Sequence, residues 1–217
     1  MACGMHSQYG LVTPRCLMRS TLRTVCIGGL LVSASLQAQS SLPAGTWRIA
    51  DVPAEFHDYV SRADLIVVSM QDAFQRELAA ALARGGPVSA LKSCHIDFVG
   101  FAQRIGRQPG VTAGRTSHRL RNPANAPKAW AAPLVQANAG RYARDVEGYA
   151  VNLGKAVGVL RPIVHRPLCN SCHGPAERLD ADVRAALKER YPADPATGFR
   201  DGEIRGWFWV EMAKQLR

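Results

Sequence analysis

The sequence has few acidic side chains, few cysteines and no long hydrophobic run. Each of these shortages limits the classes of protein to which the chain can belong. Its longest apolar run, Val25 to Leu36, has 12 residues, whereas a helix needs about 20 to span a bilayer, so a membrane anchor is disfavoured. Its 17 Asp and Glu against 27 Lys and Arg give a net charge of +10. It has no internal repeat, no low-complexity tract and no sign of an appended domain, so a single domain is expected.

The first 38 residues contain no acidic side chain at all, and they have the order of a secretory signal peptide. Three arginines precede the apolar run: Arg15, Arg19 and Arg23. A positive start, a short apolar run and small residues at a cut site predict export. We expect cleavage after Ala38, with Ala34 as the alternative, and a periplasmic protein without a membrane span. The remaining 179 residues carry a net charge of +7, scattered enough that nucleic acid is not an expected partner.

Only three cysteines remain after this cleavage: Cys94, Cys169 and Cys172. The run Cys169-Asn170-Ser171-Cys172-His173 is typical of c-type haem attachment. In that chemistry two thiols add to the haem vinyl groups, and the adjacent histidine binds the iron from below. We therefore predict one covalent haem c per chain, bonded to Cys169 and Cys172, with His173 as an iron ligand.

Three other interpretations of the motif are weaker. A thioredoxin-like redox pair would open a helix after an early strand, whereas this motif falls late in the chain. A zinc site that used Cys94 would place a histidine directly beside a cysteine, which is poor spacing for a tetrahedral ion. A plain disulfide would leave His173 without a role.

The residues alone do not decide which side chain is the second iron ligand. A predicted helix carries an apolar stripe at three- and four-residue steps: Leu91, Cys94, Phe98, Phe101 and Ile105. Cys94 lies in this stripe, either as a small buried side chain or as a thiolate ligand. The odd thiol in an oxidising compartment favours the ligand. The other candidates are His95, His118, His165, Met70 and Met212.

Helices are predicted in the first half and strands mostly in the second, which gives an α+β fold. Residues 59–84 have helical spacing, Gly85-Gly86-Pro87 ends that helix, and a second helix runs to about residue 107. The further expected elements are a strand over 111–121, a short helix over 129–137, two or three strands within 141–165 separated by Gly148, Gly154 and Gly158, a helix over 180–190 and an aromatic strand over 206–212.

Several blocks, in this order, resemble the Tll-type haem-binding domains, which are single-haem c-type domains catalogued as a domain of unknown function. The blocks are Gly85-Gly86-Pro87, Ala90 to Cys94, Arg115 to Trp130, Cys169 to Gly174, Tyr191 to Phe199 and Gly202 to Gly206. One position departs from the family, because Ala131 stands where an acidic residue is expected.

The resemblance implies a PAS-like antiparallel sheet with N-terminal helices and a haem held against it. It also implies axial ligation by Cys94 and His173. On this basis residues 1–38 form the signal peptide, 39–56 a Pro/Gly/Ser-rich lead-in segment, and 57–217 the haem-binding domain. Arg115 and Arg121 are expected to pair with the haem propionates, since guanidinium binds carboxylate bidentately.

A thiolate ligand stabilises ferric iron, and reduction of the iron weakens the iron–sulfur bond. We therefore expect a redox or gas sensor that passes its signal to a separate redox or signalling protein. The alternative is a soluble periplasmic electron carrier, and a further one is a cytochrome of the four-helix-bundle type. The sequence offers no pair of acidic and basic side chains that would indicate a catalytic site, so an enzyme is not expected.

The mass of the exported protein tests the leader. We expect a mature chain that begins at Gln39, or at Ser35 if cleavage follows Ala34, because these sites follow a small residue after the apolar run. Mass spectrometry of protein from the periplasmic fraction gives the start directly. A full-length chain in the membrane fraction would contradict export with cleavage.

Overall fold

The computed structural model describes residues 42–92 and 109–214, so the predicted signal peptide lies outside the described residues. The helices and strands, in chain order, are β1 (Thr46–Arg48), α1 (His57–Lys92), β2 (Val111–Thr116), α3 (Ala132–Ala137), β3 (Tyr149–Asn152), β4 (Ala156–Val164), α4 (Asn170–His173), α5 (Ala181–Arg190) and β5 (Ile204–Ala213). Within these ranges, none of the helices has the length and apolar character that a membrane crossing requires.

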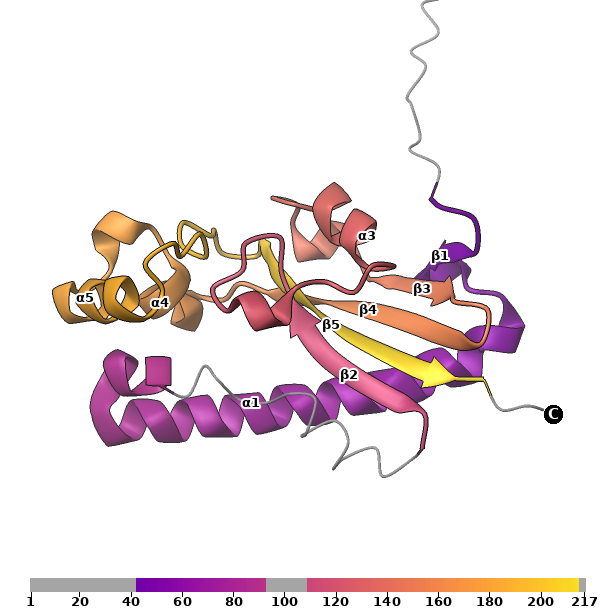
Figure 1. Ribbon diagram of the computed structural model, residues 1–217, viewed down its shortest axis with the longest axis horizontal. Coiled ribbons are helices and arrows are strands. Elements are labelled where there is room, and N and C mark those ends of the chain that lie inside the picture. The colour runs from indigo at the N-terminus through magenta and orange to yellow at the C-terminus, as the bar shows by residue number, and fades with distance from the viewer. Residues whose placement is uncertain (1–41, 93–108, 215–217) are drawn as a thin grey trace, which may run out of the picture. The chain divides into compact units, whose positions relative to one another are not determined.

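Five antiparallel strands form one sheet in the order β1-β3-β4-β5-β2 (Figure 1). The two longest, β4 and β5, pair from Ala156 opposite Ala213 to Val164 opposite Ile204. A sheet of this kind, accompanied by helices, confirms the predicted α+β class and is compatible with a PAS-like fold. It also shows that the four-helix-bundle alternative is wrong.

Helix α1 covers one face of the sheet (Figure 1). Its sheet-facing residues recur at steps of three and four, as an amphipathic helix requires: Val60, Ala63, Val67 and Met70. An ion pair adds to this packing, because Arg161 of β4 donates from Nε and Nη2 to the Asp64 carboxylate, at 2.7 and 2.5 Å. The long helix therefore packs directly on the two longest strands.

The opposite face of the sheet is covered by α3 and Trp130. Alternation along β5 divides its residues between the two faces, since Phe208 and Val210 pack toward α1 while Trp207 and Trp209 pack toward α3. This strand is apolar on both sides because both of its faces are covered. Its unusual aromatic content thus serves two cores.

The predicted break at Gly85-Gly86-Pro87 is confirmed as a kink within α1. Gly86 has a φ of +64°, a left-handed conformation that favours glycine, and both glycines are non-helical. Pro87 begins the last helical segment, where its missing N–H costs nothing. The stretch predicted to continue this helix to residue 107 lies beyond Lys92, outside the described residues.

Two local predictions are corrected by side-chain bonds and by pairing. The strand predicted over 111–121 ends at Thr116, because the Ser117 hydroxyl donates to the Arg205 carbonyl at 2.6 Å and accepts from the Arg119 N–H at 3.1 Å. These bonds replace a continued strand ladder with a turn. The lead-in segment contains a strand that was not predicted, β1, which pairs with β3.

Beyond one end of the sheet, α4 and α5 lie beside the last turns of α1 (Figure 1). Leu91 is fully buried there against apolar residues of and around α5: Leu179, Val183, Leu187 and Tyr191. Cys172 of α4 packs against the same cluster. The end of α1 and the Cys-X-X-Cys-His segment therefore share a small core.

Gly158 does not separate two strands, as the sequence suggested, but lies inside β4 under Trp130. A Cβ atom at this position would lie 2.9 Å from Trp130 Cζ2. We predict that Gly158→Val lowers the free energy of unfolding by about 1–3 kcal/mol through overpacking, measured by chemical denaturation. In a Trp130→Leu background the added cost should be smaller, and an equal cost in both backgrounds would contradict this packing.

Candidate functional site

The Cys-X-X-Cys-His segment forms two tight turns, the 3₁₀ turn Pro167–Cys169 and helix α4. The Cys169 N–H donates to the Arg166 carbonyl at 2.8 Å, and the Arg166 N–H lies 3.4 Å from the Cys169 sulfur. Within the described residues neither Cys169 nor Cys172 forms a disulfide. Both sulfurs and the His173 ring are thus presented from a single short helical turn.

The hydrogen bond of His173 settles which ring nitrogen is available to a ligand. Its Nδ1 lies 2.7 Å from the Ala196 carbonyl oxygen, which can only accept, so Nδ1 carries the hydrogen. In the neutral ring Nε2 then holds the lone pair. A bond of this kind fixes the tautomer and the orientation of a metal-binding histidine.

The surroundings of His173 keep its ring neutral. Burial lowers the pKa of His173 well below its ordinary value of 6.5, and the positive charges of Arg205 and Arg121 lower it further, while the bond to Ala196 opposes them. A neutral imidazole is the form that binds a metal. The site is therefore ready for a ligand without first losing a proton.

A polar network holds the start of the motif in place. The fully buried His165 bonds through Nε2 to Asn170 Oδ1 at 2.9 Å, and Asn170 donates from Nδ2 to Asp201 at 3.1 Å. Since Asn170 lies between the two cysteines, this network connects the motif to the loop before β5.

The ring of Phe199 lies at the centre of three imidazoles. The ring centroids of His118, His165 and His173 are 5.7, 5.8 and 6.2 Å from it. The Phe199 N–H also donates to the His173 carbonyl at 3.1 Å. This residue, 1% exposed, therefore fixes both the ring and the backbone of His173. Burial and the Arg119 charge lower the pKa of His118, which keeps that ring neutral too.

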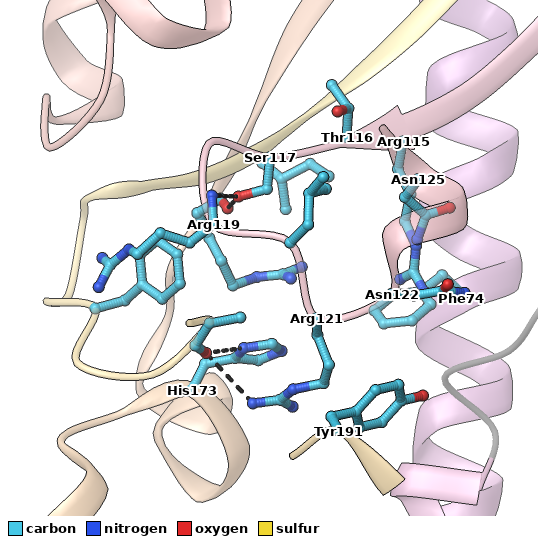
Figure 2. Close-up of a pocket in the computed structure, with 15 residues that line it drawn as sticks. Phe74, Arg115, Thr116, Ser117, Arg119, Arg121, Asn122, Asn125, His173 and Tyr191 are labelled. Carbon is cyan, nitrogen blue, oxygen red and sulfur yellow. Dashed lines mark hydrogen bonds between the residues drawn. The ribbon is translucent and has the colours of Figure 1, made fainter. Parts of the chain in front are cut away.

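Arg121 reaches the motif from the loop after β2. It forms an ion pair with Asp194, with Nε and Nη2 at 3.0 and 2.9 Å from Oδ2. Its Nη2 also donates to the Cys172 carbonyl at 2.6 Å and to the Ala196 carbonyl at 3.3 Å. Figure 2 shows the dashed lines from His173 and Arg121 meeting at one carbonyl oxygen.

Two adjoining cavities open beside the motif. The larger, of about 510 Å³, lies between α1 and β4 and is lined by apolar side chains such as Phe74, Leu78 and Ile163, with Cys169 at its side. The smaller, of about 70 Å³, is lined by His173 and Arg121 (Figure 2). Phe74, Arg115, Ile163 and Arg205 line both. The larger volume falls within the roughly 300–1,000 Å³ of small-molecule sites.

The charge of these cavities is of one sign. Among the described residues, no Asp or Glu lines either cavity, whereas five arginines do: Arg115, Arg119, Arg121, Arg166 and Arg205. An apolar slot with a positive lining, a cysteine and a neutral histidine fits a flat apolar ligand that carries carboxylates, such as haem. The residues present therefore fit the predicted group.

The structure brings most of the predicted site residues together. Cys169, His173, Arg115 and Arg121 line the cavities, and Cys172 lies one helical turn from Cys169. Arg115 lies over the Phe74 ring, with Cζ 5.1 Å from its centroid. Cys94 lies outside the described residues, as does His95.

The remaining candidate ligands lie elsewhere. Met70 and Met212 are buried in the core between α1 and the sheet, at 0% and 1% exposure. His118 and His165 pack against Phe199 and line neither cavity.

Sequence reasoning did not identify Ala196, Phe199, Asp194 and Arg205 as site residues. The signal was present, since all four lie within the blocks Tyr191 to Phe199 and Gly202 to Gly206. Their part in the site follows only from the fold, which places these blocks against a motif about 20 to 30 residues earlier in the chain.

Comparisons with known proteins agree with this picture. The Tll0287-like family model matches residues 51–213. Among solved structures, the crystal structure of the cyanobacterial haem protein Tll0287 matches with a TM-score of 0.53 and 19% identity, over 74% of this chain and 98% of that chain. No curated protein matches. At this identity the structural match speaks for the fold, and the family model spans most of the sequence, so the chain belongs to the Tll0287-like family.

Proposed function

We propose that this chain is an exported, periplasmic single-haem c-type cytochrome that acts as a haem-based redox or gas sensor. The observation that carries the proposal is the His173 bond to Ala196, which leaves Nε2 as the lone-pair nitrogen of the histidine that directly follows Cys172. Bound haem would supply one-electron chemistry and an iron site for small gases. The family relative Tll0287 is itself described as a haem protein.

The cavity residues have defined tasks in this proposal. Cys169 and Cys172 form the thioethers, and the apolar side chains of α1 and β4 exclude water from the ring. Arg115 and Arg205, which line both cavities, are the candidates to pair with the propionates. Arg121 was predicted for the same task, but two of its nitrogens already donate to protein acceptors.

The resemblance to the Tll-type domains implies Cys94 as the second axial ligand in this proposal. Leu91 is buried in the cluster that also contains Cys172, and Cys94 follows Leu91 by three residues. The described end of α1 and the attachment motif therefore share one small core. The neighbouring His173 would bind the iron from the other side.

Ligation by Cys94 and His173 would allow one ligand to be lost when the iron is reduced. A thiolate favours ferric iron, so on reduction the Cys94 sulfur is expected to gain a proton and leave. Bound haem would then offer an open iron position to CO or NO, and the loss of the Cys94 bond would be the signal. A separate redox or signalling protein would read that signal.

The alternative is a periplasmic electron carrier that keeps both ligands through the redox cycle. One observation favours it, because Leu168, directly before Cys169, is an apolar side chain that is 63% exposed. An exposed apolar residue beside the attachment site is a suitable place for a redox partner to dock.

Replacing the attachment cysteines tests the cofactor. Cys169→Ala/Cys172→Ala should lose all haem that resists denaturation, because no thioether can form, as checked by haem stain on a denaturing gel. Each single variant should keep a stained band, with its pyridine haemochrome maximum shifted by the one unreacted vinyl group. Ser171→Ala, inside the motif, is the matched control and should stain like the wild type. An equally stained double variant would contradict covalent attachment.

Replacing Cys94 separates sensor from carrier. In Cys94→Ala we expect a changed ferric optical spectrum, because the thiolate is lost, and CO binding by the reduced protein at least as fast as in the wild type. Ser93→Ala is the neighbouring control. If the ferric spectrum is unchanged and the reduced wild type shows no CO difference spectrum, the sensor mechanism is wrong and the carrier is favoured.

A further inference from the structure

One carbonyl oxygen is shared by the predicted iron ligand and by a buried ion pair. The Ala196 oxygen accepts from His173 Nδ1 at 2.7 Å and from Arg121 Nη2 at 3.3 Å. A carbonyl has two lone pairs, so both bonds can exist together. A cation draws electron density from the oxygen that accepts its hydrogen bond. The guanidinium therefore weakens the hydrogen bond that this carbonyl accepts from the imidazole.

Asp194 binds both Arg121 and the backbone N–H of Ala196. Its Oδ2 pairs with Arg121, while its Oδ1 accepts the Ala196 N–H at 2.9 Å and so fixes the turn that directs the Ala196 carbonyl. The two side chains are 7% and 8% exposed. Screening by solvent is therefore weak, and a change in either charge is felt strongly at His173.

The same arginine nitrogen also fixes the backbone of the motif. Arg121 Nη2 donates to the Cys172 carbonyl at 2.6 Å, directly before His173. The guanidinium thus contacts the haem-attachment segment and the acceptor of its histidine at once. Arg119 lines the same cavity and pairs with the buried Glu203 at 3.1 Å, but its other side-chain bond goes to the Thr197 carbonyl.

We propose that Arg121 and Asp194 are positioning residues that set the reduction potential of the iron through His173. The inference rests on the proposed haem function. A stronger bond at Nδ1 makes an imidazole a better donor and favours ferric iron, whereas an uncompensated positive charge nearby favours ferrous iron. The intact pair holds these two effects in balance.

Neutralising the two charges one at a time gives opposite expected signs. Arg121→Gln leaves the Asp194 charge and an unshared Ala196 carbonyl, so the potential should fall. Asp194→Asn keeps an oxygen for the Ala196 N–H but leaves the Arg121 charge uncompensated, so the potential should rise. Each should change the ferrous-to-ferric ratio at a fixed ambient potential about tenfold, which is ~59 mV for one electron.

Two more variants separate charge from hydrogen bonding. Arg121→Gln/Asp194→Asn removes both charges and leaves no unpaired buried carboxylate. Its potential should return toward the wild type, while the ferric EPR g-values, which report the axial histidine, stay altered. Arg121→Lys should restore most of the potential. Arg161→Gln is the control, because Arg161 is an ion-paired arginine that lines neither cavity, and it should leave the g-values unchanged.

Redox titration and EPR of the matured holoprotein decide the matter. Opposite shifts in the single variants, cancelling in the double variant, support the inference. Shifts in the same direction, shifts no larger than that of Arg161→Gln, or unfolding of the double variant would overturn it. If the wild type carries no haem on a denaturing gel, the proposed function itself fails. If haem is attached but its potential and g-values do not respond to these variants, this inference is wrong and the proposed function is unaffected.

Discussion

The site depends on the hydrogen bond from His173 Nδ1 to the Ala196 carbonyl. Without it the ring could rotate and exchange tautomers, and no particular nitrogen would be held for a ligand. The bond exists because residues 194–199 return to the motif through two backbone bonds, from Gly198 to Gly174 at 2.7 Å and from Phe199 to His173 at 3.1 Å. Two segments more than twenty residues apart therefore build one ligand position.

The rest of the molecule supports that position from two directions. The sheet and α1 line an apolar cavity, and the small core around α5 packs the end of α1 beside Cys172. The kink at Gly86 separates this end from the long helix on the sheet. The described part of α1 thus ends in the small core that also contains Cys172.

Regular patterns were predictable and non-local contacts were not. Helical spacing predicted the long part of α1, alternation predicted β2, aromatic content predicted β5, and Gly85-Gly86-Pro87 predicted the kink, because these signals are local. The three residues of β1 are too few for a period, the turn at Ser117 depends on the distant Arg205 carbonyl, and Gly158 looked like a break because its cover, Trp130, is remote. Likewise Cys169, Cys172 and His173 were evident from their spacing, whereas Ala196 acts through its backbone, which no side-chain pattern reveals.

The central claim is that a haem is bonded through sulfur to Cys169 and Cys172. Intact mass spectrometry under denaturing conditions, on protein exported by cells competent to mature cytochromes, tests it most directly. The account predicts the mature polypeptide plus the mass of one haem, with the addition located on the peptide that contains residues 169–173. A polypeptide of unmodified mass from such cells would contradict it.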